Sequence, residues 1–138
     1  MVAAVKYESF IQFQIDELVD SFGTTDTFKV VFHSDAPVAA TDDELADLIE
    51  VTGTGYTAGG EDIQNDSTRT GGTVTMTAID NVWTAGAGGF TSGRYVSTHD
   101  DTSITDKLMV SYDYGSAFVL AVGETFTVDY GASLGSFA

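Results

Sequence analysis

Apolar residues recur at helical spacing close to the N-terminus. Over residues 8–22 (ESFIQFQIDELVDSF) one helical face would carry Ile11, Ile15, Leu18, Val19 and Phe22. Ser9 and Gln12 have the spacing of a capping box, and Gly23 is typical of the residue after a helix. Residues 10–15 also alternate in part, as a strand would, but the residues that follow break the alternation. The pattern therefore predicts an amphipathic helix over 8–22.

Further along, apolar and polar residues alternate with the period of a β-strand. Residues 26–33 (DTFKVVFH) place Phe28, Val30 and Phe32 on one face, which predicts a strand with one very apolar side. The same pattern, with Gly, Asp, Asn and Ser turns between the segments, predicts strands over 73–78, 93–98, 107–114 and 124–130.

The segment between these two regions contains one more helix signal. Pro37, the single proline, marks a loop, and Thr41 to Glu44 have the spacing of a capping box. This predicts a short helix through Leu45, Leu48 and Ile49. The glycine-rich stretch 53–60 lacks the Lys-Ser/Thr ending of a phosphate-binding loop, so we interpret it as turns.

Together these patterns predict an α+β fold dominated by β-structure. The N-terminal amphipathic helix would be followed by an antiparallel β-sandwich with a jelly-roll-like body, because the strand spacing suits that architecture. A length of 138 residues fits a single domain, 1–138. Within it, residues 1–50 would form a helical third with one strand, and residues 51–138 a β-rich body.

The charge balance narrows the range of possible binding partners. Asp and Glu number 21 against 5 Lys and Arg, which gives a net charge of −16. Such a surface repels phosphate backbones and anionic lipids, so we expect neither nucleic acid nor membrane as a partner. The chain also has no apolar run of about 18 residues and no pattern of a signal peptide.

The acids are mostly Asp, with 15 Asp and 6 Glu beside only 3 Lys. Salt screens the mutual repulsion of such charges, so the composition suits a halophilic or marine setting. An ordinary acidic surface explains it equally well.

Candidate chemistry is sparse. The chain has no Cys. His33 lies on the strand face opposite Phe28, Val30 and Phe32, and His99 precedes two acids in an expected solvated turn. No GxSxG motif accompanies them, so we predict that the protein is not an enzyme and has no cofactor.

Acidic turns raise the question of a metal ion. Asp100, Asp101 and Asp106 share one predicted loop and are weak candidates for a loosely bound calcium or magnesium ion. Their spacing matches no EF-hand, and Asp that merely forms turns is the alternative.

A few residues are candidates for contact with a partner. Phe10 and Phe13 lie partly off the apolar stripe of the predicted helix, and with Tyr7 they form a candidate interface; core packing is the alternative. Arg94, in so acidic a chain, should pair with a carboxylate or stack on an aromatic ring.

An ordered series of short motifs runs through nearly the whole chain. Its members are Lys6-Tyr7, 28–32 (FKVVF), 36–39 (APVA), Ile49-Glu50, 53–60 (GTGYTAGG), 82–85 (VWTA), 93–96 (GRYV), 113–116 (DYGS) and 123–129 (GETFTVD). In this order they resemble a family of small structural proteins of tailed phages, several of which look like capsid decoration or cement proteins.

The resemblance implies a virion structural protein on the outer surface of the capsid, made in the host cytoplasm. Its partners would be the major capsid protein and further copies of itself, with a trimer as the favoured homo-oligomer. One alternative is a tail, turret or fibre-base component. Another is a soluble carbohydrate- or calcium-binding β module, for which Trp83 and Thr84 near Asn81 are the candidate sugar-binding residues.

Overall fold

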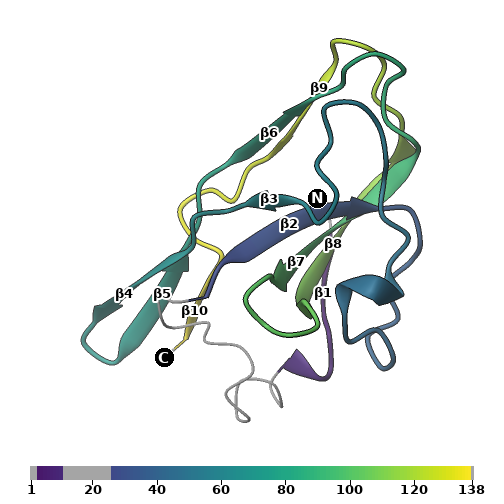
Figure 1. The fold of residues 1–138 in the computed structure, drawn as a ribbon. Helices are drawn as coiled ribbons and strands as arrows, with labels where there is room; N and C mark the ends of the chain where they lie inside the picture. Colours follow the sequence, from purple (N-terminus) through teal and green to yellow (C-terminus); the bar gives the residue numbers. More distant parts are fainter. Residues whose placement is uncertain (1–2, 11–25, 138) are drawn as a thin grey trace.

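A computed structural model describes residues 3–10 and 26–137 of the chain, and almost all of its regular elements are β-strands (Figure 1). The strands are β1 (Ala3–Lys6), β2 (Phe28–His33), β3 (Glu61–Asp62), β4 (Asp66–Thr70), β5 (Thr73–Thr77), β6 (Asn81–Thr84), β7 (Gly93–Asp100), β8 (Lys107–Phe118), β9 (Thr125–Val128) and β10 (Gly135–Phe137). A single 3₁₀ turn, η1 (Leu45–Asp47), interrupts them within the described residues.

The strands form three antiparallel sheets. The largest has the order β1-β8-β7-β2-β3, the second β10-β5-β4, and the third is the pair β6-β9. The β6-β9 ribbon rises to the tip of the molecule in Figure 1, and β4, β5 and β10 lie at the opposite end. The predicted β-dominated, antiparallel fold is therefore confirmed.

The main core lies between the five-stranded sheet and the two smaller ones. β2 contributes Phe28, Val30 and Phe32, as its alternation predicts, and these side chains meet Trp83 of β6 and Val128 of β9. All five are at most 2% exposed. Burying apolar surface from three sheets in one cluster is what joins the sheets together.

The opposite face of the large sheet is also buried. Val31 of β2 packs with Tyr7, Leu48 and Leu108 in a second, smaller cluster. Residues 34–50 help to cover this face, because Leu48 belongs to the cluster and Leu45 packs against it. β2 thus has two buried faces, which its alternating pattern does not indicate.

Neither of the two predicted helices is confirmed over its full length. The helix over 8–22 lies outside the described residues except for its first three positions. The short helix through Ile49 is wrong beyond Asp47: Leu48 adopts an extended backbone (φ −97°, ψ 147°) and leads into the pairing with β2. Asp47, which accepts from the backbone N–H groups of Asp43 and Glu44, replaces the predicted cap at Thr41.

The N-terminal third differs from its prediction in one further respect. The described part of residues 1–50 contains two strands, β1 and β2, rather than one. β1 was missed because its sequence, AAVK, carries little β signal; it forms because it pairs with β8 from Ala3↔Asp113 to Lys6↔Val110.

Candidate partner-binding surface

A hydrogen-bonded polar cluster lies on the covered face of the large sheet. His33 Nε2 is 2.8 Å from Ser97 Oγ and 3.4 Å from Ser111 Oγ, and Tyr7 Oη is 3.1 Å from Ser97 Oγ. On the other side of the ring, His33 Nδ1 is 3.2 Å from Asp35 Oδ1. A carboxylate can only accept, so Nδ1 carries the proton and Nε2 accepts from a serine hydroxyl.

This arrangement has the hydrogen-bond order of a Ser-His-Asp triad. However, the side chains of His33 and Ser97 are completely buried. The Ser97 hydroxyl is also hydrogen-bonded to Tyr7 Oη. Burial lowers the pKa of His33 below its usual 6.5, with Asp35 opposing the effect. We interpret the cluster as a structural contact that holds Tyr7, just after β1, and Asp35 against the sheet.

His99 is not in a solvated turn, and that expectation was wrong. It belongs to β7 and is completely buried; the pairing of β7 with the whole of β2 places His99 opposite Lys29. Its Nε2 donates to Gly59 O at 3.0 Å, which leaves Nδ1 as a bare acceptor 4.0 Å from Asp106 Oδ1. Burial lowers the pKa of this ring as well.

The three candidate metal ligands have separate partners. Asp101 Oδ2 pairs with Lys29 Nζ at 2.8 Å, and Asp106 lies beside His99. Asp100 is completely buried on the opposite sheet face, where burial and the neighbouring Asp26 raise its pKa to about 6. Across residues 3–10 and 26–137, no group of three or more His, Asp or Glu side chains is placed to hold a metal ion.

The candidate interface residues also occupy unexpected places. Tyr7 is completely buried, so its ring cannot meet a partner in this conformation. Phe10 is 7% exposed and packs in the main core. Phe13 lies outside the described residues. Trp83, the candidate ring for sugar stacking, is only 2% exposed and belongs to the same core.

A cluster of aromatic rings does reach the surface on the part of β8 that follows its pairing with β1. We call Tyr114, Phe118 and Phe126 the aromatic cluster. The centroids of the Phe118 and Phe126 rings are 4.6 Å apart in a stacked pair, and the ring of Tyr114 meets both edge-on at 5.5 and 5.3 Å. Phe118 and Phe126 are half-buried, and Tyr114 is 45% exposed.

The aromatic cluster is anchored to the core. Phe32 lies 4.8 Å from Phe126, and Trp83 lies 4.4 Å from Phe32, centroid to centroid. A continuous series of rings therefore runs from the buried Trp83 to the exposed Tyr114. Rings held this way lose little conformational entropy when a partner covers them.

A two-bond ion pair joins Arg94 of β7 to Asp113 of β8, next to the aromatic cluster. Arg94 Nε and Nη2 donate to Asp113 Oδ1 and Oδ2 at 2.9 and 2.8 Å, and its guanidinium lies 5.3 Å from the centre of the Tyr95 ring. Both predicted roles of Arg94 are thus confirmed. The Arg94 guanidinium and the Gly115 N–H lower the pKa of Asp113 to about 2, so this pair stays charged at any ordinary pH.

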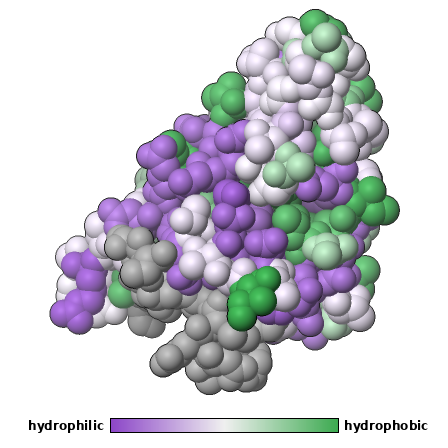
Figure 2. All heavy atoms as spheres, in the orientation of Figure 1, coloured by the Kyte–Doolittle hydropathy of each residue, from purple (hydrophilic) through white to green (hydrophobic). Residues whose placement is uncertain are grey.

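Exposed aliphatic side chains lie at the same end of the molecule as the aromatic cluster. Val119 and Val122, between β8 and β9, are 63% and 65% exposed, and Val82 of β6 is 61% exposed. Figure 2 shows hydrophobic spheres at the tip, separated by hydrophilic spheres from others lower on the molecule. This surface was not predicted, because Gly115 and Ser116 suggested a turn and the expected strand therefore ended at Tyr114.

Comparison with known proteins gives no relative: no family model, no curated protein and no solved structure matches the chain. The resemblance to phage structural proteins therefore stays a prediction. Among the described residues, no helix has the length and apolar character needed to cross a bilayer.

Proposed function

We propose that this chain is a structural protein of a tailed-virus particle that binds the outer surface of the head as a decoration or cement protein. The observation that carries the proposal is the aromatic cluster, exposed at Tyr114 on an otherwise acidic chain and anchored to the core through Phe118 and Phe126. Tyr, Phe and Arg are among the residues enriched where proteins bind each other. The ordered motifs of the sequence supply the link to a virus particle.

The acidic composition is consistent with this location. A net charge of −16 is tolerable on the outside of a shell and unfavourable beside a packaged genome. In this proposal the partner is the major capsid protein and the protein itself is a homotrimer. Its fold is a jelly-roll-like body preceded by an N-terminal helix. Many weak contacts repeated around a shell would add up to stable attachment.

The proposal is tested on particles of the virus that encodes the chain. Cryo-electron microscopy should find this protein in many copies over the head lattice. A few copies at the tail or portal would assign it to the tail, turret or fibre-base instead, and absence from the particle would overturn the proposal.

A variant pair tests the contact surface. Tyr114→Ser should reduce occupancy on stripped particles about tenfold, because an aromatic anchor at an interface typically contributes about 1–2 kcal/mol. Ile104→Ser is the matched control, since Ile104 is fully exposed in the turn between β7 and β8. Equal occupancy for the two variants would show that the aromatic cluster is not the contact.

A further inference from the structure

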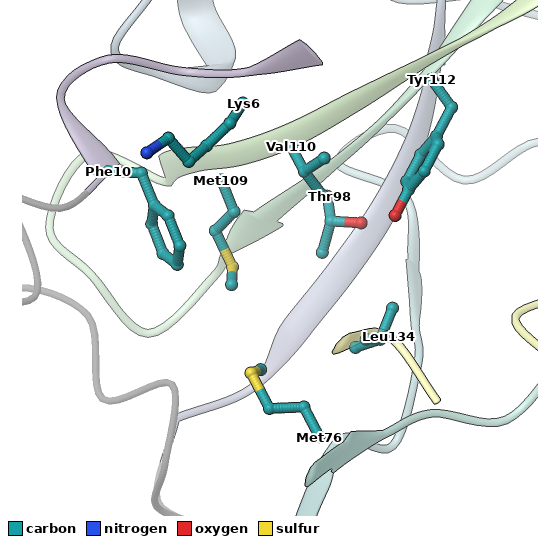
Figure 3. A pocket seen from close by; sticks show the side chains of 8 residues that line it. All are labelled: Lys6, Phe10, Met76, Thr98, Met109, Val110, Tyr112 and Leu134. Carbon is teal, nitrogen blue, oxygen red and sulfur yellow. The ribbon is translucent and has the colours of Figure 1, made fainter. Parts of the chain in front are cut away.

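An apolar pocket of about 130 Å³ lies between the five-stranded sheet and the sheet of β5 and β10 (Figure 3). Its apolar lining residues include Phe10, Met76, Met109 and Leu134. An apolar cavity of about 150 Å³ accommodates one benzene molecule, so this pocket has room for about one ring or a short alkyl chain.

The register of the large sheet builds one wall of the pocket. Lys6 pairs with Val110, and Val110 pairs with Thr98, so these residues stand side by side on β1, β8 and β7. The pairing of β7 with β8 shifts at the next position, and this irregularity turns both Met109 and Val110 toward the pocket while Leu108 packs on the opposite face. A regular strand would have sent Met109 to the other side.

The pocket contains a buried hydroxyl group that completes no hydrogen bond. Thr98 is 2% exposed, and its Oγ1 makes no hydrogen bond with any described residue. The buried Tyr130 hydroxyl lies near enough to Thr98 for a side-chain hydrogen bond between them to oppose the effect of burial, which raises the pKa of Tyr130, but neither hydroxyl completes a bond of good geometry. Figure 3 shows the oxygens of Thr98 and Tyr112 directed toward each other inside the pocket. Buried hydroxyls of this kind favour a ligand that brings a polar atom.

Lys6 adds a positive charge at the rim. Lys29, Lys107 and Arg94 each pair with a carboxylate, whereas no described residue forms an ion pair with Lys6, which is exposed. Its alkyl chain lines the pocket, and its ammonium group is the single charge among the lining residues.

We propose that this pocket binds a compact aryl or alkyl carboxylate, with its apolar body between Met76 and Met109, its carboxylate at Lys6, and a ring hydroxyl, where present, at Thr98. Size selects a single ring, the charge of Lys6 selects an anion, and the methionine side chains adapt to its shape. This inference is independent of attachment to a virus particle.

The three methionines allow a direct test in the full-length chain. Met76 and Met109 line the pocket, and Met1 lies at the chain start as an internal reference. With ¹³C-methyl-labelled methionine, phenylpropionate should shift the Met76 and Met109 signals, leave Met1 unmoved, and bind with a Kd on the order of 1 mM. Phenylpropanol, which lacks the charge, should bind more weakly.

Two variants separate the contributions of the Lys6 charge and the Thr98 hydroxyl to ligand binding. Lys6→Gln should weaken phenylpropionate about fivefold without changing phenylpropanol, and Arg69→Gln is the control for losing a cation elsewhere. Thr98→Val should abolish a preference of about fivefold for hydroxyphenylpropionate over phenylpropionate. Unmoved Met76 and Met109 signals, or equal binding of acid and alcohol to both the unmodified chain and Lys6→Gln, would overturn the proposal.

Discussion

Three buried titratable side chains, His33, His99 and Asp100, couple folding to pH. Both histidines have a folded pKa below their usual 6.5, so between the two values the unfolded chain binds more protons. Their contribution to stability is present above about pH 6.5 and is lost as pH falls through the folded pKa values. Asp100 acts oppositely: its pKa is about 6 when folded against 3.8 for the free group, so its unfavourable burial is relieved as pH falls from about 6 toward 4.

Asp100→Asn should therefore be more stable than the unmodified chain at neutral pH, because the amide avoids a buried charge beside Asp26 while its carbonyl still accepts from Thr102 N. The advantage should shrink by about pH 5, where Asp100 itself is protonated. Urea unfolding at both pH values measures it, with the exposed Asp66→Asn as the control for charge removal. A gain that is the same at both pH values would contradict the assigned titration.

His99→Gln tests the contribution of the buried histidine to the loss of stability at low pH, which is opposite in sign to that of Asp100. Glutamine can still donate to Gly59 O but cannot take up a proton, so the loss of stability between about pH 6.5 and 5 should become smaller than in the unmodified chain. An unchanged slope in the same urea series would show that His99 does not titrate in this range.

At the scale of elements, the glycine-rich loop is fixed by its approach to β2. Gly59 and Gly60 have nearly the same positive φ, +82° and +81°. A Cβ at Gly60 would lie 2.2 Å from Val30 O, whereas one at Gly59 would meet nothing within 4 Å. This loop, whose Gly59 O accepts a hydrogen bond from His99, can thus approach β2 only because Gly60 has no side chain.

This pair of glycines gives a matched experiment. Gly59→Ala should cost about 1 kcal/mol, the backbone penalty of a positive φ, whereas Gly60→Ala should cost several times more because β2 or the loop must move. Thermal unfolding of the two variants measures the difference. Equal costs would show that the loop is not held against β2.

At the scale of the whole molecule, charge repulsion opposes folding. The chain carries a net −16, and three of its five cations are already in ion pairs within the described structure. Salt screens the remaining repulsion over a distance that shortens from about 14 Å at 0.05 M to about 3 Å at 1 M.

The melting temperature should therefore rise as NaCl increases from about 0.05 M to about 1 M. Calorimetry measures this rise, and a sucrose series at low salt controls for general exclusion effects. A melting temperature that falls or stays constant with NaCl would show that the ion pairs outweigh the repulsion, and would remove the argument for a high-salt setting.

The sequence by itself determined the strands whose side chains alternate. β2, β5, β7, β8 and β9 all lie where period-two patterns predicted them, because the alternation of side chains along a strand is a local signal. Composition alone also determined the acidic surface, and the scarcity of cations indicated that Arg94 would pair with a carboxylate.

Only the tertiary structure decided the environment of the polar residues. His33, Ser97 and Tyr7 are separated by as many as 90 positions, and no local pattern indicates that they meet in one buried cluster. The same holds for the pocket, which requires the β1-β8-β7 register, and for the aromatic cluster, whose rings come from β8 and β9. Local sequence fixes which face a residue takes along its strand, whereas long-range pairing decides what covers that face, and burial follows from the covering.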